Sequence, residues 1–178
     1  MKKAFTMLEL IMVIVIIGIL AAVIIPRTGS NKTAEAAIQL ISHIRYTQHL
    51  AMVDDKFDST INWYQNLWQI RFDGTGSSYS IVSDNNPALD PLNKTNMQDI
   101  NISNDYDVTL SFSNNCDNNK TISFDHMGRP MVDDISTIAT AYTNLLTTNS
   151  CDITLTGNSA GDTVVINIEP ETGYAHIP

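Results

Sequence analysis

The chain opens with a run in which nearly every position is apolar. Between residues 5 and 25 the exceptions are Thr6, Glu9 and Gly18. An α-helix rises about 1.5 Å per residue, so about 20 apolar residues cross the hydrocarbon core of a bilayer. Pro26 should end the regular helix, because proline lacks an amide proton and clashes with the preceding turn. The pattern therefore predicts a transmembrane helix over residues 5–26.

Lys2 and Lys3 are the only charged residues before this run. Positively charged flanks stay on the cytoplasmic side of a membrane. The sequence therefore predicts a single-pass inner-membrane protein with a cytoplasmic N-terminus and a periplasmic C-terminal part.

A second helical pattern, with one apolar face, occupies residues 27–58. Thr33 is placed to cap this helix, with Glu35 in its first turn. Apolar residues then recur at spacings near three and four: Ala34, Ala37, Ile38, Ile41, Ile44 and Ala51. Such a stripe is typical of a helix that packs one face on a sheet. We expect an amphipathic continuation of the first helix.

From residue 59 onward the pattern changes to short alternations of apolar and polar residues, which favour half-buried antiparallel strands. Candidate strands cover residues 67–72, 79–83, 107–113, 121–125, 152–157, 163–169 and 174–177. The last two should form a hairpin around Glu171–Gly173, and residues 84–106 should form a long irregular loop. The predicted fold class is α+β: a long N-terminal hydrophobic helix packed onto the small antiparallel sheet of a head domain at residues 59–178.

Charge narrows the range of partners. The net charge is −9 and the sequence pI is near 4.6. The acidic residues are scattered along the chain, as on a solvated acidic surface. Such a balance disfavours non-specific binding to nucleic acid or anionic lipid. We expect no nucleic-acid partner.

The two cysteines, Cys116 and Cys151, both lie among Asn, Asp and Ser residues typical of turns. Outside the cytoplasm an even number of cysteines indicates a disulfide. We predict a Cys116–Cys151 bond, with two free thiols as the alternative.

Glu9 is the one charged residue inside the apolar run. A carboxylate at the centre of a membrane helix costs about 2.5–3.5 kcal/mol, and less near an end. Glu9 could complement the positive end of the helix dipole. Alternatively, it could neutralise a positively charged amine created on Phe5 by a cut after Ala4. Chemistry alone does not separate these two roles.

The segment "KKAFTMLELIMVIVIIGILAAVIIP" resembles the N-terminal signal of type IV pilins and type II secretion pseudopilins. The shared pattern is a basic leader, a small residue, Phe-Thr-x-x-Glu-Leu and an apolar run that reaches Pro26. The resemblance implies that residues 1–4 are a leader, which prepilin peptidase removes between Ala4 and Phe5 before methylating the Phe5 amine. It also implies that Glu9 pairs with the Phe5 amine of an adjacent subunit, and that the helix loosens before Pro26 in a filament. The family usually has glycine where this chain has Ala4.

The function implied by the resemblance is structural: a pilin-like subunit, namely a minor pseudopilin of a type II secretion pseudopilus. Three further segments, "ISHIRYTQHLAM", "ISFDHMGRP" and "INIEPETGYAHI", loosely resemble minor pseudopilins of H type. The alternatives are a minor or major type IV pilin in adhesion, motility or DNA uptake, and an uncleaved membrane-anchored periplasmic binding protein or enzyme. Implied partners are other subunits through the N-terminal helix, prepilin peptidase, an inner-membrane assembly platform and, before assembly, membrane lipid.

Other candidate chemistry is sparse, and we predict no catalytic residue, cofactor or metal site. The four histidines have no metal-ligand or catalytic spacing; they are His43, His49, His126 and His176. Three aspartates could bind calcium, but they do not have the spacing of an EF-hand loop; they are Asp73, Asp105 and Asp107. Four clustered aromatic residues are expected in the core, with a ligand patch as the alternative; they are Trp63, Tyr64, Trp68 and Phe72.

Overall fold

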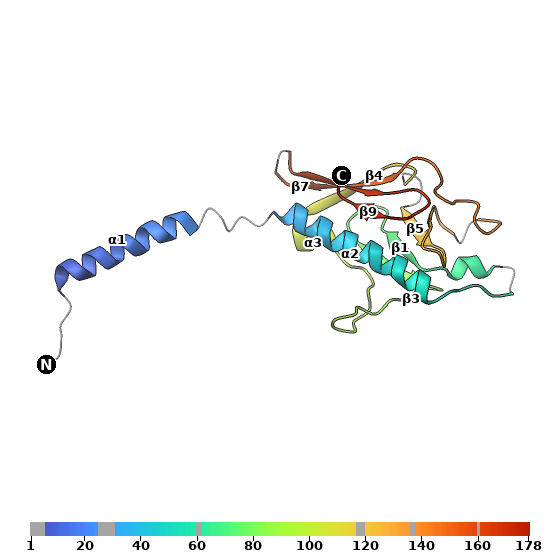
Figure 1. Cartoon of the computed structure of the whole chain (residues 1–178), viewed down its shortest axis with the longest axis horizontal. Coiled ribbons are helices and arrows are strands. Elements are labelled where there is room, and N and C mark those ends of the chain that lie inside the picture. The colour runs from blue at the N-terminus through green and yellow to red at the C-terminus, as the bar shows by residue number, and fades with distance from the viewer. Residues whose placement is uncertain (1–5, 25–30, 60–61, 117–119, 136–137, 160) are drawn as a thin grey trace. The chain divides into compact units, whose positions relative to one another are not determined.

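The computed structural model divides the chain into two units, Met1–Asn31 and Lys32–Pro178 (Figure 1). We call Lys32–Pro178 the larger unit. The structure describes residues 6–24, 31–59, 62–116, 120–135, 138–159 and 161–178, without the side chains of residues 22–24. Each unit is considered by itself.

The first unit contains helix α1, Met7–Ile24, which is built almost entirely from apolar residues. Its 18 residues make a helix about 27 Å long. No helix in the described part of the chain combines the length and the apolar character needed to cross a membrane. The predicted transmembrane helix over residues 5–26, and the single-pass inner-membrane location with it, are therefore wrong. The physical reason is length, because the hydrocarbon core of a bilayer is about 30 Å thick.

The predicted fold class is wrong as well, because a single long helix over residues 5–58 is not present. In the described part of residues 5–58 there are two helices, α1 and α2 (Lys32–Val53), and they belong to different units. The helix that packs on strands is α2, whose sequence mixes apolar and polar residues. A helix that is apolar all round offers no preferred face to a sheet, whereas an amphipathic helix does.

Two antiparallel sheets replace the one that was predicted (Figure 1). The five-stranded sheet has the order β3-β2-β1-β5-β6, and the four-stranded sheet has the order β4-β7-β8-β9. All seven predicted strands are present, with ends shifted by one or two residues, and β3 and β6 were missed. The strands are β1 (Gln69–Phe72), β2 (Tyr79–Ser83), β3 (Asn86–Pro87), β4 (Val108–Asn114), β5 (Thr121–Phe124), β6 (Pro130–Val132), β7 (Cys151–Gly157), β8 (Thr163–Ile168) and β9 (Ala175–His176).

Register is set by alternation within the strands. In β4, Val108 and Leu110 are buried while Thr109 and Ser111 are exposed. Strand β4 pairs with β7 along its whole length, from Val108 opposite Gly157 to Asn114 opposite Cys151. A shift of one residue would turn the apolar side chains to solvent, so the burial pattern fixes this pairing.

Helix α2 lies against strands of both sheets, and its buried residues form one hydrophobic core with theirs (Figure 1). Its buried residues are Thr33, Ala36, Ala37, Leu40, Ile41, Ile44, Thr47 and Ala51. The predicted stripe was displaced to one side, because Ile38 is 64% exposed while Leu40 is fully buried. The apolar arc of α2 is wider than the contact surface, so periodicity alone does not define which edge is buried.

The segment 84–106 is more regular than predicted. It contains β3, an isolated β-bridge between Leu89 and Asn96, and the short helix α3, Ile102–Tyr106. A second β-bridge joins Ile100 of this segment to Tyr79 in β2. Asn101 caps α3 by accepting a hydrogen bond from the Asn104 amide at 2.8 Å. A single turn of 3-10 helix, Trp63–Asn66, precedes β1.

The first turn of α2 is fastened to two distant segments. The Thr33 hydroxyl donates to the Asp162 carboxylate at 2.6 Å, in the connection between β7 and β8. Lys32 forms an ion pair with Asp107, at the end of α3. Gly157 lies so close that a Cβ built on it would be 2.4 Å from both the Thr33 and the Asp162 side-chain oxygens. Glycine is therefore required where the strand passes this contact.

Candidate functional site

Helix α1 is the most unusual surface of the molecule. Every side chain from residue 6 to residue 21 is exposed. Met7 is 83% exposed and Leu8 is 80% exposed. A helix that is apolar on all sides is stable only when other apolar groups surround it. This composition therefore points to association through α1.

Glu9 lies in the first turn of α1, and Thr6 caps that turn. The Glu9 amide donates to Thr6 Oγ1 at 3.3 Å and to the Thr6 carbonyl oxygen at 3.1 Å. A threonine followed three residues later by glutamate is the capping-box pattern, which places a carboxylate at the positive end of the helix. This geometry agrees with the dipole role of Glu9. The pairing with the Phe5 amine stays a prediction, because Phe5 lies outside the described residues, as do Ala4 and Pro26.

The predicted disulfide is confirmed. Cys116 follows β4, Cys151 begins β7, and the bond joins them with a Cα–Cα distance of 5.0 Å. Both cysteines are buried in the main core, where they fasten the turn after β4 to the neighbouring strand.

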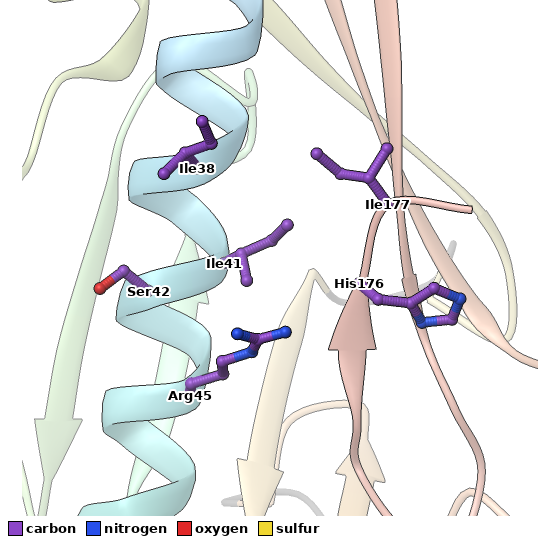
Figure 2. Close-up of a pocket in the computed structure, with 6 residues that line it drawn as sticks. All are labelled: Ile38, Ile41, Ser42, Arg45, His176 and Ile177. Carbon is purple, nitrogen blue, oxygen red and sulfur yellow. The ribbon is translucent and has the colours of Figure 1, made fainter.

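A groove runs between α2 and β9, and Figure 2 shows its lining. We call it the α2–β9 groove; its volume is about 370 Å³. It is lined by Ile38, Ile41, Ser42, Arg45, His176 and Ile177. Ile41 and Arg45 extend from α2 toward β9, and Ile177 extends back toward α2, while the His176 ring lies on the opposite side of β9. Strand β9 is an edge strand, so a sheet margin forms one wall of the groove.

Arg45 supplies the positive charge of this groove. Its guanidinium donates to the Ala175 carbonyl oxygen from Nε at 3.2 Å and from Nη2 at 2.8 Å. It also lies over the Tyr174 ring, 5.4 Å from the ring centroid, as a cation–π contact. Among the described residues it forms no ion pair with a carboxylate. The arrangement holds a cation in a groove that three isoleucines also line.

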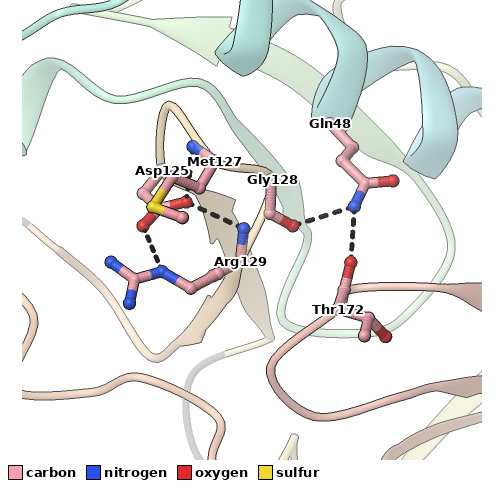
Figure 3. Close-up of polar contacts among 6 residues, drawn as sticks. All are labelled: Gln48, Asp125, Met127, Gly128, Arg129 and Thr172. Atoms are coloured by element: carbon pink, nitrogen blue, oxygen red, sulfur yellow. Dashed lines mark hydrogen bonds and ion pairs between the residues drawn. The ribbon is translucent and has the colours of Figure 1, made fainter.

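A second arrangement, the polar junction, joins α2 to two hairpin turns (Figure 3). The Gln48 amide nitrogen donates to the Gly128 carbonyl oxygen at 2.8 Å and to the Thr172 carbonyl oxygen at 2.9 Å. Asp125 is fully buried, and its carboxylate accepts from the Met127 and Arg129 amides at 3.0 and 2.8 Å. These contacts fix the turn between β5 and β6 against the turn between β8 and β9.

The Asp125 carboxylate also accepts a hydrogen bond from Arg129 Nε at 2.7 Å. A buried carboxylate with two amide donors and one guanidinium has the partners that it needs for stability. The polar junction is therefore structural, and nothing in its geometry offers a free group for catalysis.

A contact between half-buried His43 and buried Tyr79 joins α2 to the five-stranded sheet. His43 Nδ1 lies 2.7 Å from the Tyr79 hydroxyl. Burial lowers the pKa of His43 below its usual value, with a smaller opposing effect of Asp90. Burial also raises the pKa of Tyr79. Both shifts favour the neutral form of each group at pH 7.

The other candidates from the sequence do not form a site. Asp107 pairs with Lys32, and Asp73 accepts hydrogen bonds within its own turn. No group of three metal-ligating side chains occurs in the described part of the chain. Phe72 belongs to the main core and Tyr64 to a small second core, as predicted for the aromatic residues.

Arg45 and Gln48 were missed by the sequence analysis. Both are polar residues in the middle of an amphipathic helix, where the expected position is solvent. Their partners lie 130, 80 and 124 residues away along the chain. The only local signal is the Asp125-x-x-Gly128 pattern of a turn, which indicates the turn but not its contact with α2.

No protein-family model matches this chain, and no curated protein or solved structure matches it.

Proposed function

We propose that this chain is a structural subunit of a type IV pilin-like filament, specifically a minor pseudopilin of a type II secretion system. The supporting observation is the sequence Phe5-Thr6-x-x-Glu9-Leu10 at the start of an apolar helix whose described side chains are exposed. In this proposal α1 associates with the first helices of other subunits, and the larger unit forms the outer surface. Prepilin peptidase removes residues 1–4 and methylates Phe5.

The mass of the N-terminal peptide tests this proposal. The chain is isolated from its native cells, digested, and its N-terminal peptide is sequenced by mass spectrometry. A peptide that begins with N-methylated Phe5 is the expected result, because only a prepilin peptidase would produce it. A peptide that begins with Met1 would refute the processing and, with it, the proposal.

A variant in the same segment tests assembly. Glu9→Gln keeps the size and apolar surroundings of the side chain while it removes the negative charge. We expect the variant to be processed but incorporated poorly into filaments. Normal incorporation would show that the charge of Glu9 has no role in assembly.

A further inference from the structure

The α2–β9 groove is the strongest feature that the proposed function does not use. Three isoleucines form the apolar part of its walls, and two of them are open to solvent, with Ile38 64% exposed and Ile177 45% exposed. The volume of about 370 Å³ is large enough for a few side chains, and an edge strand borders it. Such a groove between a helix and a strand suits a partner that inserts a row of side chains.

The charge of the groove indicates the chemistry of its occupant. The described part of the chain contains seven lysine or arginine residues, of which Lys32, Lys56 and Arg129 form ion pairs with aspartate. Four have no ion pair among the described residues; they are Arg45, Arg71, Lys94 and Lys120. Of these four, Arg45 alone lines the α2–β9 groove. A complementary partner therefore carries a carboxylate beside apolar side chains.

Helix α1 has this composition. Glu9 is its only charged residue, and all its other residues apart from Gly18 are apolar. Met12 and Val13 follow Glu9 at spacings of three and four, so they share its face of the helix. Met12 is 65% exposed and Val13 is 44% exposed. One face of α1 thus presents a carboxylate and two apolar side chains in a row.

We infer that the α2–β9 groove of one copy receives helix α1 of a second copy, with Glu9 paired to Arg45. Met12 and Val13 then pack against the isoleucines of the groove. This inference rests on the proposed function, and it adds a surface on the larger unit to the contacts that α1 makes with the first helices of other subunits. It also gives Glu9 a partner other than the Phe5 amine. Arg45 can accept this role because its Nη1 group is not used in the contact with Ala175.

A photo-crosslinking experiment on the full-length chain tests the inference. Benzoylphenylalanine replaces Ile38, and the protein is irradiated in mild detergent as a mixture of isotopically labelled and unlabelled copies. Mass spectrometry then identifies the crosslinked peptides and separates links between copies from links within one copy. The expected product joins the groove to residues 7–13 of a second copy. A link to another segment, or only within one copy, would overturn the inference.

Charge reversal makes the test specific. Glu9→Arg and Arg45→Glu should each reduce the yield about tenfold, since each places like charges together. The double variant should recover to within about twofold of the original yield, because the pair is restored with its signs exchanged. Lys94→Glu is the matched control, with the same change of charge outside the groove, and should leave the yield unchanged. An unchanged yield in Arg45→Glu, or no recovery in the double variant, would count against the pairing.

Arg45 also holds β9, so its variants need a check of folding. Arg45→Gln removes the charge but keeps an amide donor for the Ala175 carbonyl. If Arg45→Glu unfolds at a lower temperature than the original chain, Arg45→Gln takes its place as the single variant. Loss of the crosslink is again expected. Phe5 methylation and filament incorporation are measured in parallel. Normal processing and incorporation of an Arg45 variant would refute the groove contact and leave the proposed function intact, whereas an unprocessed N-terminus would refute the proposed function itself.

Discussion

The polar junction allows a quantitative prediction, because the single side chain of Gln48 holds two hairpin turns. Gln48→Ala removes the hydrogen bonds to the Gly128 and Thr172 carbonyl oxygens, at 2.8 and 2.9 Å. Each such bond contributes about 0.5–1.5 kcal/mol. The variant should therefore lower the free energy of unfolding of the larger unit by about 2 kcal/mol. In a unit of this size that loss lowers Tm by about 4–8 °C.

Tryptophan fluorescence is the suitable assay. Both tryptophans, Trp63 and Trp68, lie in the larger unit, so the signal is independent of α1. Urea titration with this signal gives the free energy of unfolding, and a thermal scan gives Tm. The measured values can be compared directly with the predicted losses.

Two charged variants sharpen the test of the polar junction. Gln48→Glu keeps the size of the side chain, but a carboxylate cannot donate to the two carbonyl oxygens and is repelled by them. It should destabilise the unit at pH 7 at least as much as Gln48→Ala. His49→Glu adds a negative charge at the next, exposed position of α2 and should change stability by less than about 0.5 kcal/mol. Equal stability of Gln48→Ala and the original chain would refute the structural role of Gln48.

Three further predictions also concern the larger unit. A Cβ built on Gly173, at φ +66°, would lie 2.6 Å from the Gly128 carbonyl oxygen, so Gly173→Ala should cost about 2–4 kcal/mol in urea titrations. Gly161→Ala, at φ +82° in open space, should cost only about 1–2 kcal/mol, and equal losses would exclude the clash. Because burial lowers the pKa of His43, the unfolded state binds more protons below pH 6.5, so stability should fall as pH drops from 6.5 through the folded-state pKa. A urea midpoint that does not change with pH would contradict this, as would an equal dependence of the midpoint on pH in His43→Gln. Reduction of the Cys116–Cys151 bond, which spans 35 residues, should cost about 4 kcal/mol, and an unchanged midpoint in dithiothreitol would refute it.

Secondary structure in the larger unit was largely predictable because periodicity reports which face of an element is buried. Strand β4 alternates from Val108 to Ser113, and so it was predicted to within one residue at each end. The partner of each strand was not predictable. Pairing depends on turns whose direction the pattern of a single strand does not record. Strand β6 was missed because its three residues are all buried and show no alternation.

The N-terminal helix shows a different kind of error. Its apolar composition was evident, but composition reports neither where a helix begins and ends nor what surrounds it. Thr6 and Glu9 form a capping pattern that fixes the start of α1 one residue after Thr6. In the sequence analysis Glu9 was considered as a partner of the helix dipole and as part of the family resemblance, but Thr6 was not considered as a cap. Applying the cap first would have shortened the predicted helix.

The fastening of Thr33 and Lys32 has a mechanical consequence. In the proposed filament, tension would reach the larger unit through the chain that enters it at Lys32. The load would be shared at once by Asp162, between β7 and β8, and by Asp107, beside α3. The first turn of α2 would then resist separation from the rest of the unit, because it is tied to segments that adjoin strands β4 and β8. Resistance to pulling should therefore depend on two polar contacts at one end of the helix as much as on the apolar core along its length.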